Sequence, residues 1–375
     1  MICGKTSPRG KFGNIPLMTA SQLQKAFANK RFFLTGHTGF KGSWMLAILN
    51  KWNATVKGYA LDPQHANDHY NLIEGDAMCE SVIADIRDKD KVREEIERFQ
   101  PDVVIHMAAQ PLVLDSYEDP IYTYETNVMG TAYVLDAIKR LQKPCVSVII
   151  TTDKVYENLE RDIPYKEDDR LGGFDPYSNS KACADLLTTS YIRSFFSPEK
   201  YQEHQKSISV VRSGNVIGGG DWSAHRIIPD TAKALADGKE LTMRNPSATR
   251  PWQHVLEPVV GYLILAAHQM EEPLKFASAF NFGPENDDVL TVKELVEEAI
   301  SVWGSGSFTV PTNHVQPHEA GLLKLAIEKA KHELNWTPQY DSKSAIAVSM
   351  EWYKAFNDGE LLTNTQINNY LDLCK

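Results

Sequence analysis

The chain has 375 residues, of which 42% are hydrophobic and 23% charged, and its formal net charge is −10. These values are typical of a folded globular protein and exclude extended disorder and a fibrous structure. The acidic balance argues against binding nucleic acid through the bulk surface, because phosphate neutralisation needs a basic patch. No apolar run approaches the roughly 20 residues that cross a bilayer, and the beginning of the chain lacks a signal-peptide pattern, so we expect a cytoplasmic protein.

The cysteines and histidines indicate neither a disulfide framework nor a metal site. The five cysteines form no CxxC pair, which favours reduced thiols. Two histidine pairs, His65/His69 and His314/His318, have the i,i+4 spacing that can bind metal on a helix. Both pairs lie in stretches with few helix signals, and Pro317 interrupts the second, so we expect no metal.

The residues before the first strand are predicted to form a loose N-terminal arm, residues 1–30. The first half of this arm is rich in Gly, Pro and Lys and has no period. Ser21 is a plausible N-cap of a short helix that follows. We expect residues 1–17 to be dispensable.

From Arg31 onward, short apolar runs alternate with helical patterns. Strands are expected at 31–35, 55–62, 81–85, 102–109, 145–152 and 207–214, and helices at 40–52, 90–99, 122–141 and 175–187. This alternation predicts an α/β fold with a doubly wound parallel sheet, the Rossmann fold, covered by helices on both faces. After residue 214, helical segments at 255–270, 290–303 and 327–335 stand among loops, which predicts a smaller mixed α/β lobe.

A glycine-rich turn follows the first predicted strand. Gly36, Gly39 and Gly42 form GxxGxxG between a strand and a helix, a pattern that lets a dinucleotide pyrophosphate approach the backbone and the helix N-terminus. The motif alone is weak evidence. Asp62 follows the next strand at about the expected distance, where its carboxylate can accept the ribose hydroxyls and favours NAD over NADP. Asp85 and Ile86, after the third strand, are expected to meet the adenine.

Tyr177 and Lys181 lie four residues apart on a predicted helix, so their side chains share one face. A tyrosine that acts as a base near neutral pH must have its pKa lowered by roughly 3 units. A neighbouring ammonium and a cationic nicotinamide are of the right size to do this. Tyr177 and Lys181 are therefore predicted to be catalytic and to contact the cofactor.

Thr152, Asp153 and Lys154 follow a strand whose carboxyl end lies at the edge where open α/β sheets bind ligands. Thr152 can hydrogen-bond the sugar hydroxyl that Tyr177 deprotonates. An alcohol dehydrogenase needs neither Asp153 nor Lys154, so these two side chains suggest acid and base chemistry at the carbons beside the new carbonyl. A solvated turn with an ion pair is the structural alternative.

Together these residues resemble the extended short-chain dehydrogenase/reductase family, and within it the nucleotide-sugar 4,6-dehydratases that act on CDP-linked glucose. The resemblance runs from about Thr35 to Ala320. It rests on the segments "TGHTGFKGSW", "HMAAQPLV", "TNVMGT", "TTDKVYEN", "DPYSNSK", "GNVIGGGDW", "RPWQHVLEP", "NFGP" and "PHEA".

The resemblance implies a lyase with tightly held NAD that converts CDP-glucose to CDP-4-keto-6-deoxyglucose and water. Tyr177 would take the C4 hydroxyl proton while C4 gives up its hydride, the C5 proton would leave, Asp153 would protonate the departing C6 hydroxyl, and the hydride would return to C6. The product would serve deoxysugar biosynthesis, for example for lipopolysaccharide O-antigen.

The resemblance also implies roles for other residues. The predicted cofactor contacts beyond those above are Phe40, Lys41, Ala108 and Ala109, and the predicted substrate contacts are Gln110, Asn215, Arg226, Arg250 and His318. Asn127 is expected to brace the active-site strand. The resemblance implies that residues 31–215 form the NAD-binding domain and that residues 216–375 mainly form the lobe that binds the sugar nucleotide. Within the latter, residues 253–283 are expected to pack in the first domain.

Two positions depart from the family pattern. Lys154 stands where thymidine- and guanosine-linked dehydratases carry glutamate, and a lysine must be neutral to accept a proton, so the base at C5 stays open. Ala326 replaces an aspartate before a helix, which predicts the loss of an N-cap of about 1 kcal/mol.

Two other readings compete with the dehydratase. A nucleotide-sugar epimerase would use the same cofactor cycle but would not need Asp153 and Lys154 in this arrangement. A non-catalytic sugar-nucleotide-binding protein would have lost Thr152, Tyr177 or Lys181, and all three are present. The apolar faces of the helices around 122–141 and 178–195 further predict a homodimer or a dimer of dimers.

Overall fold

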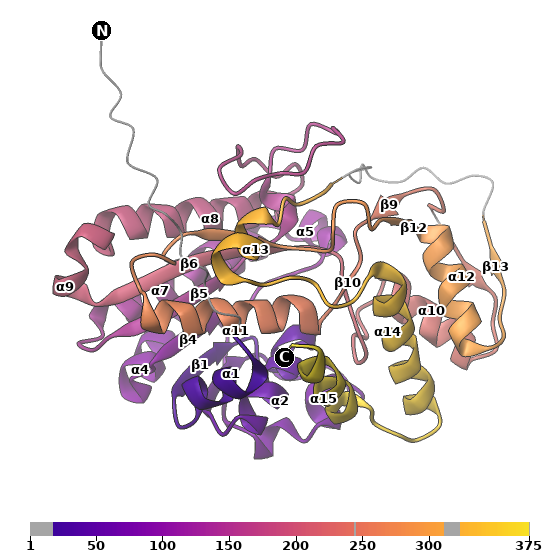
Figure 1. The fold of residues 1–375 in the computed structure, drawn as a ribbon, viewed down its shortest axis with the longest axis horizontal. Helices are drawn as coiled ribbons and strands as arrows, with labels where there is room; N and C mark the ends of the chain where they lie inside the picture. The colour runs from indigo at the N-terminus through magenta and orange to yellow at the C-terminus, as the bar shows by residue number, and fades with distance from the viewer. Residues whose placement is uncertain (1–17, 244, 311–322, 375) are drawn as a thin grey trace, which may run out of the picture.

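The computed structural model describes residues 18–243, 245–310 and 323–374. Within these residues, seven strands form one parallel sheet in the order β11-β6-β5-β4-β1-β2-β3 (Figure 1). The strands are β1 (Arg31–Thr35), β2 (Thr55–Ala60), β3 (Glu80–Ile83), β4 (Val103–His106), β5 (Cys145–Ile150), β6 (Lys206–Ser213) and β11 (Ala279–Phe282). The direction of winding reverses between β1 and β4, which confirms the predicted doubly wound fold.

Helices cover both faces of the sheet because the strands are apolar on both sides. In β1, Phe32 and Leu34 enter one buried cluster and Phe33 the other, as the two-residue period requires. One face carries α1 (Ala20–Phe27), α2 (Phe40–Lys51), α11 (Leu256–Glu271) and α13 (Glu328–Leu334), and the other α4 (Lys89–Phe99), α7 (Gly130–Arg140) and α8 (Pro176–Phe195).

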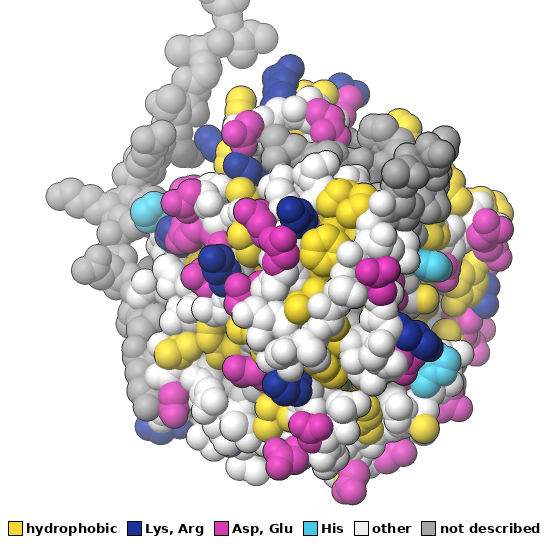
Figure 2. Space-filling view, turned by 90° about the vertical axis from the view of Figure 1, so that its right-hand side faces the viewer, with side chains coloured by type: hydrophobic (Ala, Val, Ile, Leu, Met, Phe, Trp, Pro, Cys, Tyr) yellow, Lys and Arg dark blue, Asp and Glu magenta, His cyan; other side chains and the backbone are white. Residues whose placement is uncertain are grey.

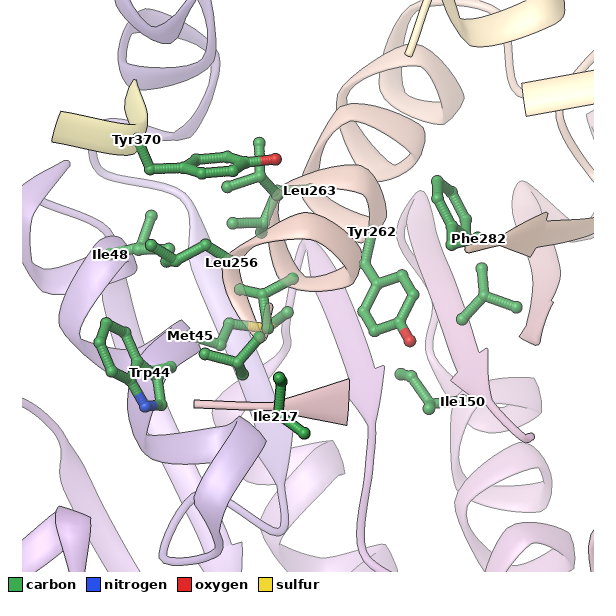
Figure 3. Packing of buried hydrophobic residues seen from close by; sticks show 14 of the residues in the cluster. Trp44, Met45, Ile48, Ile150, Ile217, Leu256, Tyr262, Leu263, Phe282 and Tyr370 are labelled. Atoms are coloured by element: carbon green, nitrogen blue, oxygen red, sulfur yellow. The ribbon is translucent and has the colours of Figure 1, made fainter. Parts of the chain in front are cut away.

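Helices α2 and α11 contact each other within the larger buried cluster. Figure 3 shows Met45 and Ile48 of α2 beside Leu256 of α11, while Tyr262 points away from them toward Ile150 of β5. Helix α11 is buried along almost its whole length, as expected for a helix that is apolar all round. This helix and β11 tie the later part of the chain to the sheet.

In the described residues of the second lobe, three helices pack on one another, and short two-residue strands accompany them. Its helices are α10 (Ile227–Ala236), α12 (Val292–Trp303) and α14 (Ser342–Asn357), and its paired strands are β7 (Val216–Ile217) with β10 (Gln253–His254), β9 (Thr249–Arg250) with β12 (Leu290–Thr291), and β8 (Leu241–Thr242) with β13 (Phe308–Thr309). Figure 2 shows acidic and basic side chains interspersed on the face of the molecule that this lobe forms.

Shorter elements connect these units. They are α3 (His69–Leu72), α5 (Val113–Glu118), α6 (Pro120–Tyr124), α9 (Tyr201–His204), α15 (Thr363–Leu373) and the turns η1 (Gly75–Ala77), η2 (Glu125–Met129), η3 (Asp153–Val155) and η4 (Pro198–Lys200). Helix α15 returns to contact α2. No helix in the described part of the chain is long and apolar enough to span a bilayer.

The helix predicted over 122–141 is interrupted. Residues Glu125–Met129 form a π-helical turn between α6 and α7. Asn127 lies in this turn, and its amide bonds the backbone of Gln110 and the hydroxyl of Ser180. Such turns aim a side chain out of the regular helical register. Asn127 thus braces the loop after β4 against α8.

A short helix stands at the end of the N-terminal arm, as expected, but the expected N-cap is wrong. Residues Ala20–Phe27 form a helix whose N-cap is Thr19, which makes a capping box with Gln22. Ser21 lies inside the helix. Leu23 and Phe27 are fully buried, and the Phe27 ring packs on Phe32 with 5.1 Å between ring centroids. Burial of these two side chains fixes a segment that composition alone presents as polar.

Replacing Phe27 with alanine tests whether α1 belongs to the core. We expect Phe27→Ala to lower the free energy of unfolding by about 3–5 kcal/mol, because it empties a buried aromatic site. Gln24→Ala, at an exposed position of the same helix, should change it by less than about 0.5 kcal/mol. Equal urea midpoints for both variants would contradict this packing.

Candidate active site

The turn after β1 has the shape of a phosphate cradle. Gly36 has a φ of +75°, and a Cβ there would lie 2.9 Å from the Ala108 nitrogen, while a Cβ on Gly42 would lie 2.0 Å from the Gly36 oxygen. At Gly39 the nearest atom to such a Cβ is 3.4 Å away, and no side chain caps the start of α2. The space beside Gly39 and the N-terminus of α2 therefore fit an approaching anion such as a pyrophosphate.

The side chains between these glycines hold the turn in place. The His37 ring fills the space beside Gly58, where a Cβ would be 2.3 Å from it, and its Nε2 lies 2.8 Å from the Ser81 hydroxyl. Burial lowers the pKa of His37 to about 4, so this ring is neutral. Thr38 donates to the carbonyl oxygen of Leu61 at 2.8 Å. Phe40 packs against Gly218, in the loop after β7.

The predicted ribose and adenine contacts lie near the ends of β2 and β3. Asp62 is exposed, two residues after β2. The carboxylate of Asp85 is held by Arg87, with 2.8 Å between Nη2 and Oδ2, and this partner lowers the pKa of Asp85 against the effect of burial. Ile86 is buried against Gly130. The cofactor contacts of Asp62, Asp85 and Ile86 stay predictions.

The loop after β4 is fixed from both sides. The Thr35 hydroxyl accepts the backbone N–H groups of Met107 and Ala108 at 3.0 and 3.1 Å, which places Ala108 beside Gly36. Ala108 and the next residue, Ala109, are half-buried. The Gln110 amide donates to Thr123 and Leu112 and accepts from the Leu112 nitrogen. Gln110 is thus engaged within the loop, which does not favour the predicted substrate contact.

Thr152 and Asp153 lie at the carboxyl end of β5, in the turn η3. The Thr152 hydroxyl donates to Asp153 Oδ1 at 2.8 Å, and Asn215 Nδ2 lies 3.5 Å from Oδ2. A Cβ on Gly214 would be 1.9 Å from Asp153 Oδ2. Asn215, which was predicted to hold the sugar, therefore also contacts the predicted acid, Asp153. Residue 214 must be glycine, because any side chain there would overlap the Asp153 carboxylate. Lys154 follows in the same turn, half-buried.

Helix α8 brings Tyr177 and Lys181 to the same place. Asp175 caps the helix, and Pro176 occupies its first turn. The Lys181 ammonium donates to the carbonyl oxygen of Ile150 at 2.8 Å, which ties it to the end of β5. Burial, followed by the charge of Lys41, lowers the pKa of Lys181 to about 7.

The pKa of Tyr177 differs from the sequence-based expectation. Burial raises it to about 12, and the neighbouring Thr152 hydroxyl is the largest opposing effect. The cation that lowers the pKa of Tyr177 is Arg226, which lies outside the YxxxK motif. In the protein alone, the cost of burying a phenolate exceeds the effect of the surrounding cations.

The remaining predicted residues lie around this centre. Arg226, held by Asp221 at 2.7 Å, faces both Tyr177 and Lys41. Lys41 also faces Asp153, and burial lowers its pKa to about 8. Arg250 is buried in β9, where its guanidinium donates to the Thr249 oxygen. His318 lies outside the described residues.

A small cavity lies next to Asp153 on the side of the second lobe. Its lining includes Asp153, Gly214, Pro251, Gln253, Asn286 and Lys324. The stretch that follows Arg250 therefore reaches the carboxylate of Asp153. The predicted acid lies between the sheet and the second lobe.

Sequence reasoning missed two residues of this site, Asp221 and Gly214. Asp221 is 3% exposed and orients Arg226, and Gly214 makes room for Asp153. Both stand in "GNVIGGGDW", but nothing in their spacing from Thr152 or Tyr177 indicates the contact.

Comparison with known proteins agrees with this geometry. A family model described as GDP-mannose 4,6 dehydratase matches residues 33–348. The chain is 43% identical to a CDP-glucose 4,6-dehydratase of Salmonella typhimurium, over 91% of this chain and 96% of that protein. It is 26% identical to a dTDP-glucose 4,6-dehydratase of the same organism, over 90% and 95% of the two chains.

A solved structure shares the fold. A dTDP-glucose 4,6-dehydratase from Streptomyces venezuelae, solved with NAD and TYD bound, superimposes with a TM-score of 0.74 at 23% identity and covers 88% of this chain and 98% of its own. With the family match over most of the sequence, the chain belongs to the GDP-mannose 4,6 dehydratase family of nucleotide-sugar dehydratases, within the extended short-chain dehydrogenases/reductases.

Proposed function

We propose that this chain is an NAD-dependent CDP-glucose 4,6-dehydratase, which forms CDP-4-keto-6-deoxyglucose and water. The observation that carries this proposal is the Asp153 carboxylate held within hydrogen-bonding distance of Thr152, beside Tyr177. Oxidation at C4 needs Tyr177 and Thr152, whereas elimination also needs an acid for the C6 hydroxyl. An epimerase has no use for that acid.

The choice of CDP-glucose and NAD draws on the relatives. The relative at 43% identity is named for CDP-glucose, and structures of the same fold are solved with NAD. When bound, NAD would take up the hydride from C4 and give it back at C6. The cradle at Gly39 and the N-terminus of α2 would hold its pyrophosphate, and Asp62 its adenosine ribose.

The chain's own residues would act in a fixed order. Tyr177 accepts the proton of the C4 hydroxyl, which Thr152 helps to orient. The new carbonyl makes the C5 proton acidic, and Asp153 protonates the C6 hydroxyl so that it leaves as water. Lys154 stands next to Asp153 and either takes the C5 proton or stabilises the enolate.

Two arginines would hold the substrate's diphosphate. Arg226 is oriented by Asp221 near Tyr177, and Arg250 is adjacent in the chain to Pro251 in the cavity beside Asp153. A guanidinium can bind two phosphate oxygens at once. These arginines supply local positive charge to a protein with a net charge of −10.

We further propose that the enzyme is a homodimer through α8 and the helices packed on it. Large apolar side chains on these elements are exposed, namely Ile121, Met129, Leu186 and Phe195, and α6, η2 and α7 all contact α8. A self-complementary pair of such faces would bury them.

Light scattering should give twice the chain mass for the wild type, and Leu186→Asp should give a monomer. A wild-type monomer at micromolar concentration would contradict the dimer.

The proposed reaction is tested by incubating the protein with NAD and one nucleotide sugar at a time. We expect mass spectrometry to show loss of one water from CDP-glucose and much slower loss from dTDP-, UDP- and GDP-glucose. Tyr177→Phe should abolish the loss while NAD stays bound. If none of the four sugars loses water, the proposed function is wrong.

The glycine turn gives a separate prediction about cofactor binding. A methyl group on Gly39 fits the free protein but occupies the space proposed for the pyrophosphate. Gly39→Ala should therefore unfold like the wild type yet bind NAD at least about tenfold more weakly, a change of about 1.4 kcal/mol. Gly42→Ala is the matched control, because its methyl collides with backbone and should lower the melting temperature. Unchanged NAD affinity in Gly39→Ala, measured by calorimetry, would contradict the proposed cradle.

A further inference from the structure

The loop of residues 218–221, which follows β7, ends in the carboxylate that orients Arg226. Oδ2 of Asp221 accepts a hydrogen bond from Arg226 Nη1 at 2.7 Å, and Oδ1 accepts one from the backbone N–H of Ser223 at 3.1 Å. The Asp221 side chain is buried. Both carboxylate oxygens are engaged, so the direction of the Arg226 guanidinium follows the position of this loop.

Arg226 keeps most of its hydrogen-bond donors for a ligand. A guanidinium carries five N–H groups, and among the residues that the structure describes only Asp221 accepts from one of them. The Arg226 side chain is 34% exposed. A guanidinium held at one corner can present its other N–H groups to two phosphate oxygens at once. The angle at which it does so depends on Asp221.

Tyr353 of α14 joins the two ends of the loop. Its hydroxyl oxygen lies 2.5 Å from the carbonyl oxygen of Asp221 and 3.2 Å from the carbonyl oxygen of Gly218. A phenol has one hydrogen, so the two carbonyls share it, and the nearer one forms the stronger bond. The Tyr353 side chain is buried. A single oxygen atom from the second lobe therefore holds residues 218 and 221 at a fixed separation.

Aromatic side chains hold the middle of the same loop. Trp44 Nε1 of α2 donates to the carbonyl oxygen of Gly219 at 3.0 Å, and the His69 ring is stacked on Trp44 with 4.8 Å between centroids. A Cβ on Gly219 would lie 2.0 Å from the Trp352 ring, and a Cβ on Gly220 would lie 2.6 Å from the Cβ of His69. The loop is thus packed between α2 on the sheet and α14 of the second lobe.

Hydrogen bonds fix the His69 ring against this loop. Trp352 Nε1 donates to the Thr363 hydroxyl at 3.0 Å, and that hydroxyl lies 2.8 Å from His69 Nε2. His69 Nδ1 lies 2.7 Å from the Ser43 hydroxyl, which donates to the carbonyl oxygen of Phe40 at 2.9 Å. The single hydrogen of Ser43 is used in this way, so His69 Nδ1 donates and Nε2 accepts. With both nitrogens bonded, the ring stays beside the loop.

We propose that Tyr353 is a positioning residue for the anion site of the enzyme. By joining Gly218 to Asp221, its hydroxyl sets the direction of the Asp221 carboxylate and, through it, the direction of Arg226 toward the diphosphate of the nucleotide sugar. This inference rests on the proposed function, in which Arg226 binds that diphosphate. Tyr353 acts through Asp221 and Arg226 and needs no contact with the substrate.

Tyr370 of α15 provides a matched control. Its hydroxyl is also buried and donates to Glu257 Oε2 at 2.6 Å, in a hydrogen bond that does not involve the loop. Tyr370→Phe and Tyr353→Phe each remove one buried hydroxyl and keep the ring. A loss of ligand affinity that comes only from a weakened fold would be seen in both variants, whereas a loss that comes from Arg226 would be seen in Tyr353→Phe alone.

The test is a double-mutant cycle on the binding of CDP, measured by calorimetry in the presence of saturating NAD. Arg226→Ala should weaken CDP binding about 10- to 100-fold, because hydrogen bonds from a charged donor are lost. Tyr353→Phe should weaken it about 3- to 10-fold, and Tyr370→Phe by less than about twofold. In the Arg226→Ala background, Tyr353→Phe should cause less than about a further twofold loss, because the group that it positions is gone.

An unchanged CDP affinity in Tyr353→Phe would overturn the proposal. A loss of the same size with and without Arg226 would also overturn it, because Tyr353 would then act on the fold. If Tyr353→Phe does not fold, Asp221→Asn takes its place in the cycle, since the amide keeps the shape but removes the ion pair. Its loss should likewise vanish in the Arg226→Ala background, and a loss that remains there would overturn the proposal.

Water loss from CDP-glucose by the wild type separates this inference from the proposed function. If water is lost but the effects of Tyr353→Phe and Arg226→Ala are independent, the positioning role alone is wrong. If CDP binds and the cycle shows the expected coupling but no sugar loses water, the dehydratase function alone is wrong. If the wild type neither binds CDP nor releases water, both are wrong.

Discussion

The close approach of the Asp153 carboxylate to the backbone of Gly214 is the constraint on which the site depends. Strands β5 and β6 are neighbours in a parallel sheet, so their carboxyl ends meet at one edge. A side chain at position 214 would take the place of the carboxylate. With glycine there, Asp153 turns back toward Thr152, and Tyr177 from α8 completes the group.

The elements around this edge explain why the group stays in register. Lys181 of α8 donates to the last residue of β5, and Asp185 of the same helix forms a buried ion pair with Arg212 of β6 at 2.8 Å. Buried pairs of this kind cost desolvation and fix geometry rather than add much stability. Helix α8 is thereby attached to both strands that end at the site.

Much of the fold could be predicted from the sequence because its signals are local. The apolar runs at 31–35 and 145–150 and the glycines of the turn between β1 and α2 each indicate their structure within a few residues. The π-helical turn at Asn127 could not be predicted, because it depends on contacts with Gln110 and Ser180, 17 and 53 residues away. A short helix was expected near Ser21, but the burial of its residues Leu23 and Phe27 could not be predicted, because it depends on contacts with the core of the sheet.

The sequence predicted which of these side chains would lie together, but not their electrostatics. The motifs named Thr152, Asp153, Tyr177 and Lys181, and the structure brings them together at the end of β5. The spacing suggested that Lys181 lowers the pKa of Tyr177. In the structure, burial raises this pKa more than the neighbouring groups lower it. The cation that lowers it is Arg226, which comes from a loop of the second lobe. The desolvation of a titratable group depends on all the atoms packed around it, and a short sequence motif does not specify those atoms.

In the proposed reaction, the hydrogen removed from C4 is returned to C6 of the same sugar. The most direct measurement uses CDP-glucose that carries deuterium at C4, with NAD as the only added cofactor and NMR of the product. The account predicts a 4-keto sugar with the deuterium in its C6 methyl group. Deuterium that is lost to solvent, or that remains at C4 of an unoxidised or epimerised sugar, would contradict it.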